Sequence, residues 1–228
     1  MNLLEFRSVM GREIPVFIYG TDGPITLVIG GIHGDEPGGV VLAEEFIHRL
    51  QSNSIKNLVG KIVVIPRANP DGLIAGTRVN ARGIDINRNF PTRDFKQGHF
   101  TQSCNPGKQA GSEPETRGIL HVAEVYKPKL ILAFHAELGC INYDGPGDFI
   151  AKVISSENGL PVRQDLGYPT PGSLGTYFGA ERDIPVITWE LLDHDHQWER
   201  HGNAIIAALG MNQGSRSYSF QKSCNNSL

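Results

Sequence analysis

Two histidines and a glutamate stand directly after apolar stretches of the chain, where their side chains could bind a metal ion. His33 directly follows the apolar residues 25–32, and Glu36 lies three residues after His33. His135 directly follows the apolar residues 130–134. Two imidazoles and one carboxylate, with a fourth position open, form a catalytic zinc set. His33 with Glu36 is a weak signal alone, and His135 alone fits a hydrogen-bonded core histidine equally well. Together, the three residues favour one metal ion per chain.

Glu190 is a carboxylate inside an otherwise apolar stretch, residues 184–191. A charge in such a stretch is costly unless it is paired or functional, so a salt-bridged structural glutamate is the alternative interpretation. A zinc-bound water needs a nearby carboxylate that takes its proton and passes it to the leaving amine. Beside a metal site, Glu190 is therefore predicted to be the general base and acid.

Residues 78–91, RVNARGIDINRNFP, are rich in arginine and asparagine and contain no lysine. Charged stretches are usually solvated faces, but this one alternates with the apolar Ile84 and Ile86. Guanidinium groups bind carboxylates through paired donors, and a further arginine can stabilise the negative charge that develops on a carbonyl. The pattern favours a loop that binds a substrate carboxylate.

These side chains need a scaffold that brings strand ends together. Four apolar, β-branched stretches predict buried strands: residues 25–32, 61–66, 130–134 and 184–191. Three amphipathic patterns predict helices: residues 37–50, 112–126 and 198–209. The second helix opens with a capping-box spacing between Ser112 and Glu115. Strands that alternate with helices indicate a single α/β domain, with a mixed, mostly parallel twisted sheet flanked by helices.

Two segments do not follow this alternation. Residues 67–109 are long and poor in apolar periodicity, which is typical of a functional excursion. Residues 211–228 are polar and rich in Ser and Asn, so we expect a weakly ordered tail after a catalytic domain of residues 1–210. His194, His196 and His201 have no partner pattern and are expected on the surface.

Composition limits the class of protein. The 228 residues are 39% apolar, enough for the core of one domain. A formal charge of -3, with 21 scattered lysines and arginines, argues against a nucleic-acid partner. The first residues lack signal-peptide features and a membrane-spanning stretch, so we expect a cytoplasmic protein without membrane association. Three cysteines favour free thiols, with a Cys104–Cys140 disulfide as the alternative. The oligomeric state leaves no mark in the sequence.

In order and spacing, several motifs resemble those of the zinc carboxypeptidases, in particular the bacterial murein tripeptide amidases, which cleave γ-D-glutamyl-meso-diaminopimelate. The matching pieces are GGIHGDEP, NPDG, RVNARGIDINRNFP, LAFHA, GYPTPGSLGTYFG and ITWEL, which cover most of the chain up to about Leu209. The resemblance implies zinc-dependent hydrolysis of an amide next to a substrate carboxylate, with a small peptide as substrate. It also implies that His33, Glu36 and His135 hold one Zn²⁺, and that Glu190 is the general base and acid.

The same resemblance implies which residues contact the substrate. Asn87 and Arg88 would grip its terminal carboxylate. Arg78 would polarise the scissile carbonyl, with Arg82 as the alternative because it lies only four residues further on. Tyr168 would close over the substrate, since it precedes a Gly-Ser pair at a similar distance to the mobile tyrosine of peptide-digesting carboxypeptidases.

Two alternatives use the same residues. A deacylase similar to the succinylglutamate desuccinylase and aspartoacylase group would share the zinc set and the Asn-Arg pair but cleave an N-acyl amino acid; the segment TPGSLGTYFG argues against it. A non-catalytic binding module would use the arginine-rich loop to hold a carboxylate ligand. Such a module usually loses a metal ligand or the base, and here all four are present.

Overall fold

A seven-stranded sheet forms the centre of the molecule, whose computed structural model describes residues 6–55, 58, 60–95, 101–192 and 197–212. The strands in spatial order are β3 (Phe17–Gly20), β5 (Lys61–Ile65), β4 (Ile25–Ile29), β6 (Leu130–Ala136), β9 (Val186–Leu191), β7 (Cys140–Asp144) and β8 (Val162–Arg163). β3 is antiparallel to β5, and β7 is antiparallel to β9, while the other neighbours are parallel. The predicted mixed, mostly parallel sheet is confirmed. A separate hairpin-like pair joins β1 (Phe6–Arg7) to β2 (Glu13–Ile14).

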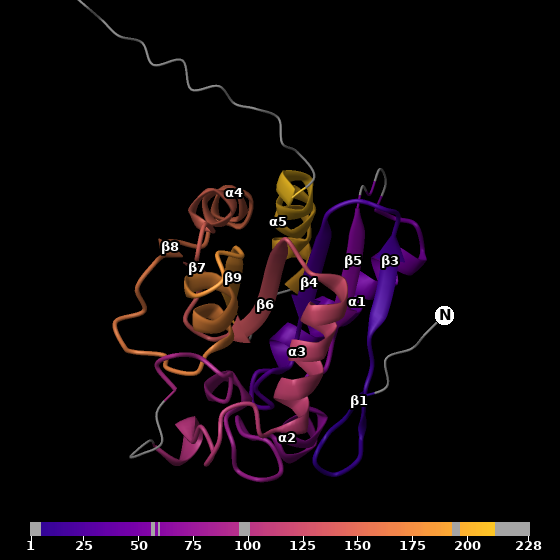
Figure 1. Ribbon diagram of the computed structural model, residues 1–228. Helices are drawn as coiled ribbons and strands as arrows, with labels where there is room; N and C mark the ends of the chain where they lie inside the picture. Colours follow the sequence, from indigo (N-terminus) through magenta and orange to yellow (C-terminus); the bar gives the residue numbers. More distant parts are fainter. Residues whose placement is uncertain (1–5, 56–57, 59, 96–100, 193–196, 213–228) are drawn as a thin grey trace, which may run out of the picture.

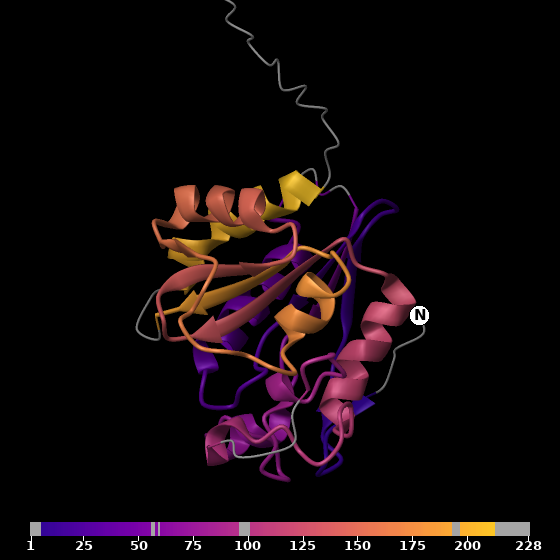
Figure 2. The same cartoon turned by 60° about the vertical axis from the view of Figure 1, so that its left-hand side comes forward.

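Helices cover both faces of this sheet (Figures 1 and 2). One face packs against α1 (Pro37–Gln51), α4 (Asp148–Asn158) and α5 (Gln197–Asn212). The other face packs against α3 (Pro114–Tyr126) and the π-helix η3 (Gly175–Ala180). Three short helices lie in the connection from β5 to α3: α2 (Pro70–Ala75), η1 (Ile86–Arg88) and η2 (Gln102–Cys104).

Neighbouring strand residues bury their side chains in opposite layers of the core. Val28 and Leu132 face the layer of α1, whereas Leu27 and Ile131 face the layer of α3. All four are almost completely buried. Because both faces of the sheet are covered, β4, β5 and β6 are continuous apolar runs rather than alternating ones. This is the pattern from which the sequence predicted them.

Two details of the predicted elements are wrong. The strand predicted at residues 25–32 is β4, and it ends at Ile29. Gly31 adopts a positive φ of 62° and turns the chain away from the sheet before residue 32. The predicted capping box does not form: α3 begins at Pro114, and the Ser112 hydroxyl donates to Glu113 Oε1 at 2.7 Å. Glu115 is instead buried and accepts a hydrogen bond from the Val9 amide at 3.1 Å.

The two irregular segments differ from their predictions in different ways. Residues 67–109 are less irregular than expected, since α2, η1 and η2 lie within them. α5 continues to Asn212, past the expected boundary at residue 210, and most of the expected tail lies outside the described residues. Cys104 and Cys140 are free thiols, so the alternative disulfide is not formed.

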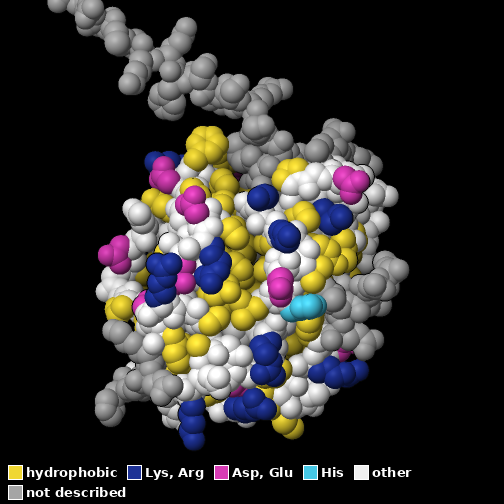
Figure 3. Space-filling model, in the orientation of Figure 1, with side chains coloured by type: hydrophobic (Ala, Val, Ile, Leu, Met, Phe, Trp, Pro, Cys, Tyr) yellow, Lys and Arg dark blue, Asp and Glu magenta, His cyan; other side chains and the backbone are white. Residues whose placement is uncertain are grey.

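The surface carries charges of both signs. In Figure 3 the Lys and Arg side chains on the visible face are dispersed among acidic and apolar ones. Among the helices of the described ranges, none has the length and apolar character needed to cross a bilayer.

Candidate active site

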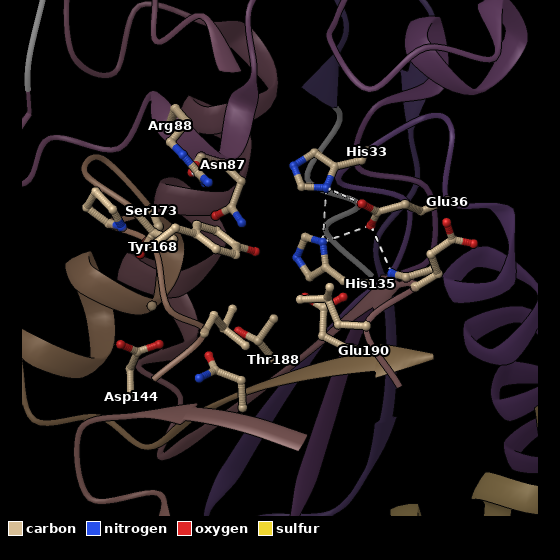
Figure 4. Close-up of a pocket in the computed structure, with 18 of the residues that line it drawn as sticks. His33, Glu36, Asn87, Arg88, His135, Asp144, Tyr168, Ser173, Thr188 and Glu190 are labelled. Carbon is tan, nitrogen blue, oxygen red and sulfur yellow. Dashed lines mark hydrogen bonds and ion pairs between the residues drawn. The ribbon is translucent and has the colours of Figure 1, made fainter. Parts of the chain in front are cut away.

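A pocket of about 480 Å³ gathers eight of the nine predicted site residues (Figure 4). They come from the β4–α1 turn, the loop before and within η1, the ends of β6 and β9, and the segment before η3. Its walls include His33, Glu36, Arg78, Asn87, Arg88, His135, Tyr168 and Glu190. The pocket therefore lies at the carboxyl ends of the parallel strands β4, β6 and β9, where open α/β sheets hold their ligands.

The three predicted metal ligands converge on one point. His33 Nδ1 lies 2.8 Å from Glu36 Oε1, and His135 Nδ1 lies 2.9 Å from Glu36 Oε2. The two Nδ1 atoms are 3.1 Å apart. All three side chains are buried, and their ligand atoms lie within 4.8 Å of one another. Two imidazole nitrogens aimed at each other and at one carboxylate form a donor set that suits a single cation.

The turn between β4 and α1 sets His33 and Glu36 side by side. Glu36 immediately precedes the first helical residue, Pro37, whose fixed φ suits a helix start. Gly34 packs directly on the backbone of Gly72, where a Cβ at position 34 would overlap the Gly72 carbonyl carbon. The Gly34 amide also donates to the Thr77 carbonyl at 3.0 Å. A close backbone approach thus fixes the residue between the two ligands.

Asp85 is a site residue that the sequence analysis did not single out. His33 Nε2 lies 3.1 Å from Asp85 Oδ1, and Arg78 Nε donates to Asp85 Oδ2 at 2.9 Å. With the Nε2 proton donated to Asp85, the Nδ1 lone pair of His33 is free for a metal, an arrangement found around many metal-binding histidines. The sequence does contain a signal for Asp85, because this charged residue stands between two apolar ones, Ile84 and Ile86, which are buried.

The carboxylates around His33 control its protonation. Burial alone lowers the pKa of His33, but the charges of Glu36 and Asp85 outweigh it and raise the pKa to about 9. The pKa values of Glu36 and Asp85 are held well below their usual range, because burial, which raises them, is outweighed by the neighbouring imidazoles and, for Asp85, the arginines. Without a metal the cluster holds a proton, and a divalent cation would compete with it.

Glu190 lies next to the candidate metal ligand His135, on the adjacent strand. It is the β9 residue paired with His135 on β6, and it is 6% exposed. Burial raises the pKa of Glu190 above its usual value, His135 lowers it, and the charge of Glu36 raises it again. A carboxyl with a raised pKa beside a metal site can accept a proton and later return it.

Arg78 and Arg82, which sequence alone could not separate, have different surroundings. Arg78 lines the pocket, and its Nη1 lies 3.3 Å from Glu36 Oε1. The Arg82 side chain is 54% exposed, does not line the pocket and pairs with Glu113 at 3.4 Å. The structure thus brings Arg78 to the site and leaves Arg82 outside it.

Asn87 and Arg88 stand on η1 across the pocket from the candidate metal ligands (Figure 4). Asn87 Oδ1 accepts a hydrogen bond from the Leu174 amide at 2.8 Å, so the side chain offers its amide donors to the pocket. Arg88 is 6% exposed, and its Nη1 donates to the Asn87 carbonyl at 2.8 Å. Gly172 packs against the Arg88 backbone with a φ of 72°, and a Cβ there would overlap the Arg88 carbonyl oxygen.

Tyr168 lies on the loop between β8 and η3, and its ring reaches into the pocket toward the two histidines (Figure 4). Tyr168 is 48% exposed, more than the candidate metal ligands and Glu190. Burial raises the pKa of Tyr168, and the charge of Glu190 adds to this, so the hydroxyl is a neutral donor at pH 7. The position allows contact with a bound ligand.

The prediction that His201 lies on the surface is wrong. It is completely buried on α5, with its ring 5.5 Å from that of Trp189 and its Nδ1 3.3 Å from Asn158 Nδ2. The buried Ala204, Ile205 and Ala208 follow His201 at spacings of three, four and seven residues, which puts all four on one face of a helix. This pattern could have predicted that His201 lies in the core. His194 and His196 lie outside the described residues.

Comparison with known proteins agrees with this geometry. Residues 3–156 match the family described as zinc carboxypeptidase. The chain belongs to the zinc carboxypeptidase family. The matched residues include all three candidate metal ligands, and membership makes this chain a hydrolytic enzyme.

Relatives within the zinc carboxypeptidase family extend the match. Murein peptide amidase A of Vibrio campbellii is 33% identical over an alignment of 218 positions that covers 89% of this chain and 85% of that protein. Murein peptide amidase A of Escherichia coli K12 is 32% identical over an alignment of 178 positions that covers 72% of this chain and 69% of that protein. The crystal structure of murein-tripeptide amidase MpaA from Escherichia coli O157 superposes with a TM-score of 0.71 at 27% identity, over 92% of this chain and 90% of that one.

Proposed function

We propose that this zinc carboxypeptidase relative hydrolyses the γ-D-glutamyl-diaminopimelate amide bond of murein tripeptide, or a related amide of a carboxylate-bearing peptide. One observation carries the proposal: the three candidate metal ligands, the buried Glu190 and the Asn87–Arg88 pair line a single pocket. The similarity to two murein peptide amidases over 72–89% of the chain supports the choice of substrate.

One Zn²⁺ per chain would be held by His33, Glu36 and His135, because their donor atoms already converge and the set leaves a position open. When bound, zinc supplies Lewis acidity to the scissile carbonyl and lowers the pKa of water. Asp85 would keep the Nδ1 atom of His33 directed at the ion. Metal analysis of the purified protein should give one zinc per chain.

The protein's own side chains account for substrate positioning and proton transfer. Arg88 and Asn87 bind the substrate's terminal carboxylate, which places the neighbouring amide near Glu190. Glu190 takes a proton from the attacking water while the water oxygen forms a bond to the carbonyl carbon. Arg78 donates to the oxygen that becomes negative. Glu190 then gives the proton to the amide nitrogen as the C–N bond breaks, releasing an amine and a carboxylate.

Hydrolysis of L-Ala-γ-D-Glu-meso-diaminopimelate tests the proposal. The purified protein should release free diaminopimelate, lose this activity with a chelator and regain it with zinc. The same peptide with a carboxamide in place of the carboxylate that neighbours the scissile amide should be a poor substrate. A neutral carboxamide cannot form an ion pair with Arg88. If a folded, zinc-loaded sample cleaves N-acyl amino acids but not this peptide, the alternative deacylase function replaces the proposal.

We also propose that the protein acts in the cytoplasm. The free thiols of Cys104 and Cys140 support this, because reduced cysteines are typical of that compartment. Fractionation of cells that express the chain at its native level would test the location, and recovery outside the cytoplasm would exclude it.

A further inference from the structure

A closed loop in the arginine-rich segment brings Arg78 and Asp85 together. The Asn80 amide donates to the Ile84 carbonyl at 2.9 Å, and the Gly83 amide donates to the Asn80 carbonyl at 2.9 Å. Gly83 has a φ of 72°, a left-handed conformation that glycine adopts without a steric penalty. Arg78 and Asp85 stand at the two ends of this loop, where Arg78 Nε donates to Asp85 Oδ2 at 2.9 Å. The loop therefore sets the position of the arginine that lines the pocket.

The Asn80 side chain holds this loop in shape. Its Oδ1 atom accepts hydrogen bonds from the backbone amides of Arg82 and Ile84 at 3.0 and 3.1 Å. Its Nδ2 group donates to Glu113 Oε2 at 2.8 Å and to Glu115 Oε2 at 3.0 Å. Asn80 is 3% exposed, and the two protons of its amide group match these two acceptors. Both ends of the side-chain amide are thus fixed.

Two buried carboxylates at the start of α3 anchor the asparagine. Glu113 and Glu115 are 3% and 1% exposed, and α3 begins at the end of the molecule that carries the loop (Figure 1). The Val9 amide, which follows β1, donates to the second oxygen of Glu115. Burial raises the pKa of Glu115, and the hydrogen bond from Asn80 opposes this. The loop is therefore tied to α3 and to the segment after β1.

This network serves to fix an arrangement. Carboxylates that are removed from water are costly unless hydrogen bonds compensate for the loss. A buried polar network whose groups are all satisfied makes its surroundings rigid and specifies one conformation. Here that conformation belongs to residues 80–84, so the network determines how Arg78 and Asp85 approach each other.

We propose that Asn80 is a positioning residue for the hydrolytic reaction: anchored on Glu113 and Glu115, it keeps Arg78 at the place where the scissile carbonyl becomes negative. The inference rests on the proposed function, in which Arg78 donates to that oxygen. Asn80 does not line the pocket, so it acts through the loop and not by contact with the substrate. A displacement of about 1 Å at a group that contacts the reacting atoms can lower a rate about 100-fold.

A double-mutant cycle tests whether Asn80 acts through Arg78. On L-Ala-γ-D-Glu-meso-diaminopimelate, Asn80→Ala should lower kcat of the zinc-loaded enzyme about 10- to 100-fold and change KM less than about threefold, because Asn87 and Arg88 remain in place. In the Arg78→Ala background the same change should cost less than about threefold. An equal loss of kcat in both backgrounds would overturn the inference, and so would a normal kcat in Asn80→Ala.

An exchange of amide and carboxylate keeps the test informative if Asn80→Ala does not fold. Asn80→Asp places a third carboxylate beside Glu113 and Glu115, so kcat should fall. Adding Glu115→Gln returns an amide donor to the pair and restores the number of charges, so kcat should recover by about threefold or more. A normal kcat in Asn80→Asp, or no recovery in the double variant, would show that this contact does not position Arg78.

Asn158→Ala is the matched control, because it also removes a buried asparagine. Asn158 ends α4 on the opposite face of the sheet, is 8% exposed, and its Oδ1 accepts from the Leu160 amide at 3.0 Å. This variant should lower the melting temperature but keep the wild-type kcat. A loss of kcat as large as that in Asn80→Ala would assign the effect to general destabilisation and overturn the inference.

The Arg78 Nε–H resonance separates this inference from the proposed function, because it reports the Arg78–Asp85 hydrogen bond without turnover. In proton–nitrogen correlation NMR spectra of zinc-loaded protein, the resonance is assigned by its loss in Arg78→Lys. Asn80→Ala should shift or broaden it, whereas Asn158→Ala should not. If the peptide is not cleaved but the resonance changes in Asn80→Ala, the proposed reaction fails and the positioning of Arg78 by Asn80 stands. If the peptide is cleaved and Asn80→Ala leaves the resonance and kcat unchanged, the inference alone fails.

Discussion

Asp85 connects three functional groups although it does not line the pocket. One of its oxygens accepts from the Asn87 amide at 2.9 Å and lies near His33 Nε2, and the other accepts from Arg78 Nε. A single buried carboxylate therefore orients the candidate metal ligand His33, the pocket arginine Arg78 and the start of η1. Its charge also stabilises the positive charges around it.

Asp85→Asn should weaken zinc binding while the fold is retained. The amide keeps a similar shape but removes the charge that orients the His33 imidazole, and loss of such a partner typically costs about 10- to 100-fold in metal affinity. Competition with a chromophoric chelator would measure the zinc Kd. Asp148→Asn, which changes an exposed carboxylate on α4 that pairs with Lys152, is the control with an expected wild-type Kd. An unchanged Kd in Asp85→Asn would contradict the orienting role.

The protonation of Glu190 should set the acidic limb of the pH profile. A general base acts only when it is deprotonated, so kcat/KM should fall as the pH decreases through the pKa of Glu190. Since burial raises this pKa, the fall should begin above the pH expected for an ordinary glutamate. Glu190→Gln should lower kcat by about 10²- to 10⁴-fold, keep one zinc per chain and lose this limb. A variant with normal turnover would remove Glu190 from the mechanism.

The three candidate metal ligands could be singled out from the sequence because two of them are histidines close after apolar stretches and Glu36 lies three residues after the first. His33 and His135 are conspicuous for this reason. Arg78 and Arg82 could not be separated, since spacing alone says nothing of where two nearby loop arginines point.

At the scale of elements, the turn between β4 and α1 depends on close backbone packing. Gly34 lies against Gly72 on α2, and Gly39 in the first turns of α1 lies against the Phe134 backbone on β6, where a Cβ would come within 2.8 Å of the carbonyl oxygen. These contacts place the start of α1 close to β6. Glu36 can therefore reach His135 from a neighbouring element.

Gly34→Ala should damage both stability and the metal site. Its methyl group would overlap the Gly72 backbone, and overpacking of this kind typically costs about 1–3 kcal/mol. Movement of the turn would also separate His33 from Glu36, so the zinc content should fall. Urea denaturation and metal analysis would measure both effects. Gly210→Ala on α5, where a Cβ meets no atom within 4 Å, should leave both unchanged or raise stability slightly.

Elements that are apolar on both faces were predicted well, and those with mixed surroundings were not. β4, β6 and β9 lie in the middle of the sheet and are continuous apolar runs. β7 was missed because Asn142 and Asp144 face the pocket and interrupt its apolar pattern. The edge strands β3 and β8 are short or half exposed, so packing by distant segments defines them more than their own sequence does.

For the whole molecule, a metal ion at this site would join segments that are far apart in the sequence. His33 and His135 are separated by 102 residues, and they belong to the β4–α1 turn and β6. The unfolded chain cannot present this donor set preformed, so zinc should bind the native state preferentially and stabilise it. The same argument predicts that the stabilisation disappears when one ligand is removed.

Zinc should raise the melting temperature of the chelator-treated protein. At free zinc of 100 times Kd, the stabilisation is about 2.7 kcal/mol. For a chain of this size each kcal/mol shifts Tm by about 2–4 °C, so differential scanning calorimetry should show an increase of about 5–10 °C. His135→Ala should show no increase, whereas His48→Ala, which changes an exposed histidine on α1, should show the full one. An increase of equal size in His135→Ala would mean that zinc acts elsewhere on the molecule.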